Sequence, residues 1–153
     1  MKYVRRVLQP GESIVHVTRL HLVTFLPAML WFAVTLALLI TALSLGGDLR
    51  IGGYALAVFA AMFGLTAAVP ALIRRVSTEL AVTDRRVIYK SGIFARHTLE
   101  MNRSKVESVD VDQSLLGRLL GFGTIIVRGT GGSLEPIRMI SDPLTFRSHI
   151  TAG

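Results

Sequence analysis

The chain contains two long apolar runs, followed by short segments in which apolar and polar residues alternate. No charged residue occurs from 22 to 45 or from 51 to 73. A helix of that length spans roughly 35 Å, more than the roughly 30 Å hydrocarbon core of a bilayer. The connection at 46–50 is long enough only for a tight turn. The pattern therefore predicts a two-helix transmembrane hairpin within 22–75.

After residue 75 the apolar positions recur at every second residue, as is typical of half-buried antiparallel strands. In the fourth such segment the alternation slips at Glu107-Ser108, which indicates a β-bulge. Asp142 followed by Pro143 is an N-cap and first-turn signal, and it predicts a terminal helix over 142–150. The sequence thus predicts a small α+β, mostly-β domain over 76–153, with about six strands at 77–83, 87–90, 93–101, 106–111, 124–128 and 135–140.

A leucine-rich segment interrupts this series of strands after the fourth one. Ser114 is placed to cap a short helical turn, and glycines bound the segment. We expect Leu115, Leu116 and Leu119 to be buried beneath the sheet. Arg118 should then point outward or donate to loop carbonyls.

The net charge of +7 is concentrated beside the apolar runs. Residues 1–21 carry +3, Arg74 and Arg75 follow the second run, and the connection between the runs is neutral. The two apolar runs predict a multi-pass protein of the cell inner (cytoplasmic) membrane, and the positive-inside rule predicts its orientation. Both termini would be cytoplasmic, as an N-terminal segment over 1–21 and a domain over 76–153. A cleaved signal peptide is the alternative, but the first run is about twice the length of a signal core.

The sequence contains few residues that are suited to catalysis or metal binding. There is no cysteine, and the four histidines show no metal-ligand spacing with one another or with carboxylates. The glycine-rich stretch at 129–132 lacks the lysine and hydroxyl residue of a phosphate loop. Residues 76–153 carry a net charge of only +2, which argues against nucleic acid as a partner. We expect no enzyme activity, no catalytic residue, no metal and no cofactor.

Two motifs in the C-terminal domain carry a resemblance to a known family. The first is Thr83-Asp84-Arg85-Arg86 followed by Gly92, and the second runs from Ser114 to Thr124, with Asp142-Pro143 closing the domain. The opening at 8–12 also looks like that family. The chain resembles bacterial PH-like domain membrane proteins of the YdbS/YdbT-like family, in which a short membrane hairpin precedes the domain. The resemblance implies a PH-like antiparallel sheet closed by a C-terminal helix. It marks as structural the motif residues Thr83, Asp84, Arg85, Arg86, Gly92, Gly117, Arg118, Gly121, Gly123, Asp142 and Pro143.

Two functions follow from these expectations, and a third stays open. In the first, the domain is a protein-interaction module, an adaptor or assembly factor whose partner is another membrane or cytoplasmic protein, and homo-oligomers are left open. In the second, the domain binds anionic lipid headgroups. In the third, the chain is an accessory subunit of a membrane transport complex. The residues placed to contact lipid or a partner are Arg74, Arg75, Arg85, Arg86, Lys90 and Arg96.

Overall fold

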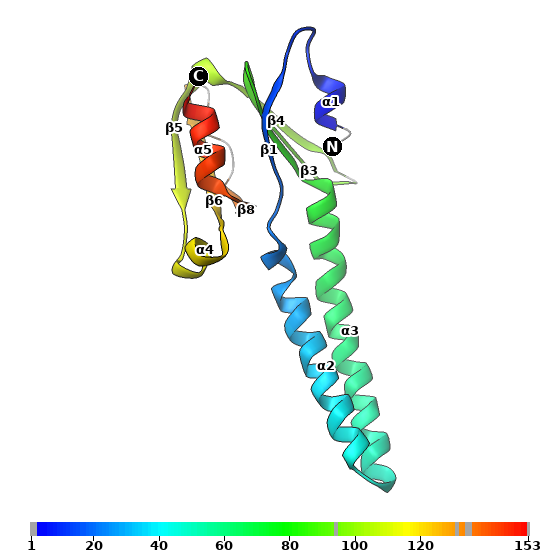
Figure 1. The fold of residues 1–153 in the computed structure, drawn as a ribbon. Coiled ribbons are helices and arrows are strands. Elements are labelled where there is room, and N and C mark those ends of the chain that lie inside the picture. The colour runs from blue at the N-terminus through cyan, green and yellow to red at the C-terminus, as the bar shows by residue number, and fades with distance from the viewer. Residues whose placement is uncertain (1–2, 94, 131, 134–135, 153) are drawn as a thin grey trace. The chain divides into compact units, whose positions relative to one another are not determined.

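The computed structural model describes residues 3–93, 95–130, 132–133 and 136–152 (Figure 1). The chain divides into two compact units. The helical unit comprises residues 22–73. The domain unit comprises residues 1–21 together with 74–153, so both ends of the chain contribute to it.

The helical unit consists of a 3-10 turn, η1 (Leu22–Phe25), and the helix α2 (Leu26–Ser44), followed by most of α3 (Gly47–Ser77). By length and composition, the segment from Leu22 to Ser44 and the helix α3 can each cross a membrane. Only 11% and 22% of their most apolar stretches are buried within the structure. The two long apolar helices are as predicted, and their crossing of a membrane stays a prediction.

Small residues bring the two helices close together. A Cβ on Gly53 would lie 2.7 Å from the Ala42 Cβ, and one on Gly64 would lie 2.9 Å from the Phe32 ring. The rings of Trp31 and Phe63 stack with centroids 5.0 Å apart. In lipid, the burial of apolar side chains does not drive helices to associate, so membrane helices pack through small residues that allow close approach. The contacts between α2 and α3 are of this kind.

The domain unit holds two antiparallel sheets (Figure 1). The first has the order β1-β2-β3-β4. The second has the order β5-β6-β7, and β8 also pairs with β6. The strands are β1 (Ile14–Thr18), β2 (Glu79–Thr83), β3 (Arg86–Ser91), β4 (His97–Asn102), β5 (Val106–Asp112), β6 (Phe122–Gly129), β7 (Gly132–Ser133) and β8 (Ile137–Ser141). The remaining elements are α1 (Tyr3–Val7), η2 (Arg103–Lys105), α4 (Leu115–Leu120) and α5 (Pro143–Thr151).

The predicted strands are present with shifted ends. The register of β5 shifts between Val106 and Ser108, which confirms the predicted bulge. The strand expected over 93–101 begins only at His97. Two predicted strands include a residue, 94 or 135, that lies outside the described residues.

The strand β1 was not predicted, and it changes how the helical unit is attached. In the antiparallel pair β1–β2, Thr18 faces Leu80. The helices between them are therefore an insertion within a β-hairpin, and both ends of the insertion leave the domain unit from neighbouring strands. Along the chain, the helical unit therefore does not precede the domain but interrupts it between two paired strands.

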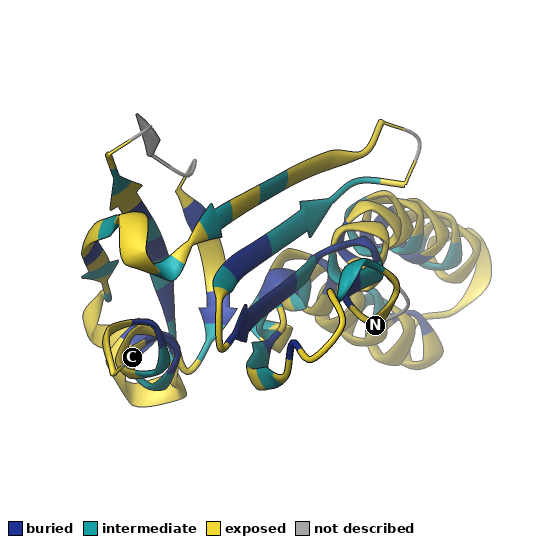
Figure 2. Ribbon diagram, turned by 90° about the horizontal axis from the view of Figure 1, so that it is seen from above, coloured by how far each residue is buried: buried dark blue, intermediate teal, exposed yellow. Residues whose placement is uncertain are grey.

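The main core of the domain unit draws on both sheets and on α5. Its buried residues are Leu80, Val82, Val87, Val109, Ile125, Val127, Ile137, Ile140, Phe146 and Ile150. Figure 2 shows buried positions gathered on the strands and on α5, whereas α2 and α3 are mostly exposed. The expectation of an antiparallel sheet closed by a C-terminal helix is wrong, because the described strands form two sheets and α5 packs against strands of both.

The helix α5 begins where Asp142-Pro143 predicted, but the carboxylate does not cap it. Asp142 has a left-handed backbone (φ 49°), and its side chain makes no capping hydrogen bond to any described residue. Its carbonyl oxygen accepts from the Phe146 N–H at 3.2 Å. The buried Pro143 ring fixes the first turn in place of a side-chain cap.

The leucine-rich segment forms the expected short helix α4, and its predicted burial is wrong. Ser114 caps it as predicted, since its Oγ accepts from the Gly117 N–H at 3.0 Å. The exposed fractions of Leu115, Leu116 and Leu119 are 84%, 64% and 81%. The reason is Gly117, which is buried and faces β6. A Cβ there would lie 2.6 Å from the Phe122 carbonyl oxygen, so the leucines must face away from the domain unit.

Candidate functional site

The Thr-Asp-Arg-Arg motif forms the turn between β2 and β3. Thr83 ends β2 and is fully buried, and its Oγ1 accepts from the backbone N–H groups of Arg85 and Arg86 at 3.2 and 2.9 Å. A threonine hydroxyl that bonds to the next backbone amides is a common way to fix a turn. The motif therefore holds the tight turn at Asp84-Arg85.

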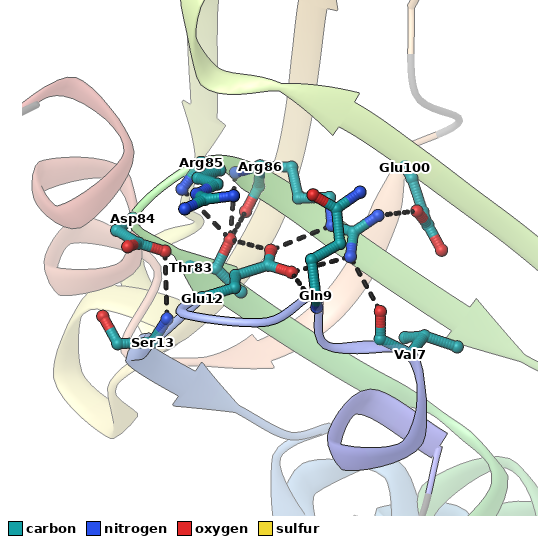
Figure 3. Close-up of polar contacts among 9 residues, drawn as sticks. All are labelled: Val7, Gln9, Glu12, Ser13, Thr83, Asp84, Arg85, Arg86 and Glu100. Carbon is teal, nitrogen blue, oxygen red and sulfur yellow. Dashed lines mark hydrogen bonds and ion pairs between the residues drawn. The ribbon is translucent and has the colours of Figure 1, made fainter.

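Arg86 is the centre of a buried ion-pair network (Figure 3). Its guanidinium donates through Nε and Nη2 to both carboxylate oxygens of Glu12, at 2.9 and 2.7 Å. Its Nη1 donates to Glu100 at 2.6 Å, and Nη2 also donates to the Val7 carbonyl at 2.8 Å. The Glu12 side chain has no exposed surface and that of Arg86 is 12% exposed, so the pair is shielded from water.

Thr83 and Asp84 of the motif also bond to the N-terminal loop that contains Glu12. The Thr83 hydroxyl lies 2.7 Å from a Glu12 oxygen, and the Ser13 N–H donates to the Asp84 carboxylate at 3.1 Å. Glu12 also accepts from the Gln9 N–H at 2.8 Å. Hydrogen bonding from Arg86 lowers the pKa of Glu12 to about 2, against an opposing effect of burial. This network is a clamp that joins the start of the chain to the sheet (Figure 3).

The six basic residues that the sequence proposed as contacts do not form one face. Arg86 is bonded inside the clamp, whereas Arg74, Arg85 and Arg96 are exposed. Lys90 donates from Nζ to the Ser77 carbonyl at 2.9 Å. With Arg6, Tyr3 and Glu79, the residues Lys90 and Arg96 line a cavity of about 210 Å³.

Arg75 lies at a second cavity of about 220 Å³, which Arg19 also lines. Its Nη1 is buried and has no hydrogen-bond partner among the described residues. Arg19 and Arg75 thus come together although more than fifty residues separate them, because the insertion leaves and rejoins the domain unit at paired strands. Both residues are among the flanking charges on which the predicted orientation rests.

The motif glycines have identifiable structural roles. Gly92 has φ of 83°, and a Cβ there would lie 2.0 Å from the Ala95 carbonyl oxygen. Gly121 ends α4 in the left-handed conformation, with φ of 75°. A Cβ on Gly123 would lie 2.7 Å from the Gln113 side chain. These positions need glycine for the turn or for close approach.

Two features escaped sequence reasoning. Glu12 entered only as a charge and as part of the opening at 8–12, and no sequence signal links it to Arg86, 74 residues away. His16 on β1 and His149 on α5 stack with ring centroids 4.6 Å apart, and no spacing along the chain reveals that contact. Burial lowers the pKa of His16, and the neighbouring His149 lowers it further.

Two antiparallel sheets with a helix packed on both fit a small PH-like domain. The sequence matches the family of bacterial PH domains over residues 19–152, so the chain belongs to that family. No curated protein and no solved structure matched the chain. PH domains are commonly modules that bind lipids or proteins, and the family therefore supports an interaction or lipid-binding module here.

Proposed function

We propose that this chain is an integral protein of the inner (cytoplasmic) membrane, of the YdbS/YdbT-like kind, whose PH-like domain is a non-catalytic adaptor or assembly module. The insertion of an apolar helix pair between β1 and β2 carries the proposal. On these helices Leu30, Leu36, Phe59 and Met62 are each about three-fifths exposed. Apolar surface on that scale calls for lipid or for another protein to cover it.

Protein binding is favoured over headgroup binding because of where the charges lie. Arg86 is bonded to two carboxylates and a carbonyl, so it adds no free charge for a phosphate. The strand β4 lies at an edge of the first sheet, where it pairs only with β3 among the described strands. Its exposed residues include Thr98 and Glu100. An edge of this kind can accept a strand from a partner.

Headgroup binding remains the second candidate, on one specific observation. The cavity beside Arg6, Lys90 and Arg96 gathers three cationic side chains and a single carboxylate, that of Glu79. A phosphate could replace the solvent there. We rank it second because the Glu79 carboxylate already accepts from the backbone of Tyr3 and Val4 and keeps negative charge at the cavity.

The proposed topology has a direct test. A reporter that is active only outside the cytoplasm should be silent when fused after Gly153 and active when inserted within 46–50, because both basic flanks favour the cytoplasmic side. Activity of the C-terminal fusion with silence of the loop insertion would overturn the orientation. Extraction of the full chain by alkaline carbonate without detergent would overturn membrane integration itself.

The proposed binding mode can be tested in native membranes with the full chain. A photo-reactive amino acid at Thr98 on the β4 edge should yield crosslinks to protein, and one at the exposed Arg147 on α5 should yield far fewer. Anionic lipid retained after purification, measured by mass spectrometry, should not fall in the double variant Lys90→Gln/Arg96→Gln. Loss of that lipid together with absent Thr98 crosslinks would favour the headgroup function.

A further inference from the structure

The helix α4 turns its apolar face outward, whereas a helix on a soluble protein buries that face. At about 100° per residue, its four leucines fall within an arc of about 140°. The buried Gly117 lies outside that arc and packs on β6, so the leucine face points away from the domain. Leu120 is 52% exposed, in addition to the three leucines described above. The leucine face is therefore a contiguous apolar surface that no described residue covers.

The segment that follows α4 contacts the point where the chain leaves the domain unit. The His21 ring stacks on Phe122, two residues after α4, with centroids 5.4 Å apart. The His21 N–H donates to the Met139 carbonyl at 2.6 Å, and Leu20 bridges to Ile140. The residue after His21 is Leu22, which opens the first apolar run. The chain therefore leaves the domain unit at His21, directly before the first apolar run.

The charges on α4 also suit a bilayer surface. Its one charged residue is Arg118, which is exposed, and the helix contains no acidic residue. A short helix with leucines on one face and a cation beside them is the composition of an interfacial helix. The long arginine stem can lie along apolar surface while its guanidinium stays among headgroups. Met139 on β8, whose carbonyl oxygen accepts from the His21 N–H, is 43% exposed.

We propose that α4 is a second membrane contact, which inserts the leucine face into the boundary between headgroups and acyl chains. The proposal rests on the proposed function, because it requires that the helical unit already holds the domain at the membrane. Two transmembrane helices fix the distance of the domain from the bilayer, and α4 would fix its orientation. The β4 edge would then be presented to partners at a defined angle.

The absence of cysteine makes depth measurements in the full chain straightforward. An environment-sensitive fluorophore is attached at Leu119→Cys, and the protein is reconstituted at low density in vesicles with nitroxide-labelled phosphatidylcholine. The control is Val15→Cys, because Val15 is 45% exposed and lies at the far end of β1 from His21. The reference for the span is Leu36→Cys. We expect the Leu119 label to be quenched several-fold more than the Val15 label.

Each outcome has a definite consequence. Quenching at Leu36 without quenching at Leu119 beyond that of Val15 overturns the α4 contact and leaves the proposed function standing. No quenching at Leu36 overturns both. A blue-shifted Leu119 label that nitroxide lipid does not quench overturns the lipid assignment, because a second copy of the protein would then cover the face.

A second variant separates membrane contact from a structural role. Leu115→Ser/Leu119→Ser, with the label at Leu116→Cys, should lose most of the quenching. The melting of the domain unit should stay unchanged because both leucines are exposed. Unchanged quenching in this variant would overturn the proposal, as would a large loss of domain stability, since the leucines would then belong to the core.

Discussion

Arg86→Ala should destabilise the domain unit by about 3–5 kcal/mol, because it leaves the buried Glu12 carboxylate without its main partner. Glu12 has no exposed side-chain surface and accepts two hydrogen bonds from this guanidinium. A loss of that size is a large part of the roughly 5–15 kcal/mol that holds a domain together. The measurement is urea unfolding of the full chain in nanodiscs, followed by hydrogen exchange of the β2 and β3 amides.

The adjacent arginine supplies a matched control. Arg85 is exposed, so Arg85→Ala should change stability by no more than about 0.5 kcal/mol. The double variant Glu12→Ala/Arg86→Ala should cost clearly less than the sum of the two single variants, because it removes both charges. Equal losses at Arg85 and Arg86 would show that the clamp does not hold the N-terminal loop in place.

The clamp also gives the domain an acid dependence with a defined sign. The pKa of Glu12 is lowered from its usual 4.5 to about 2 by the Arg86 hydrogen bond. The stabilisation from Glu12 is therefore fully present above about pH 4.5 and is lost as the pH falls toward about 2. In Glu12→Gln this dependence is absent, so the stability gap to the parent chain should close over that interval. A gap that stayed constant would contradict the assignment.

Phe146→Ala should destabilise the domain unit by about 3–5 kcal/mol, because it empties a large site in a packed core. Phe146 on α5 has no exposed surface, and it belongs to the cluster that joins β2, β3, β5, β6 and β8. Its ring also lies 6.1 Å from that of His16 on β1. Urea unfolding in nanodiscs measures the loss.

The same helix provides the control for this substitution. Arg147 is exposed, and Arg147→Ala should be nearly neutral because alanine favours helices. Hydrogen exchange adds a second readout. If α5 holds both sheets together, then Phe146→Ala should increase exchange in β2 and in β6 alike. Faster exchange in β6 alone would show that α5 stabilises only the second sheet.

What the sequence determines here is local in character. An uncharged run of more than twenty apolar residues admits few structures other than a long helix. Alternation with a period of two predicted most of the strands, and the slip at Glu107-Ser108 located the bulge, because each depends on neighbouring residues. The cap at Ser114 and the start of α5 at Pro143 were also readable from adjacent positions.

The tertiary structure alone decided which distant segments meet. The pairing of β1 with β2 spans the whole helical insertion, and neither strand carries a signal for the other. For the same reason Arg86 looked like a surface charge until Glu12, 74 residues away, was found beside it. The leucines of α4 looked like core residues because apolar character shows only a preference for leaving water. Whether they leave it for the protein interior depends on which face of the helix packs, and in the fold Gly117 takes that position.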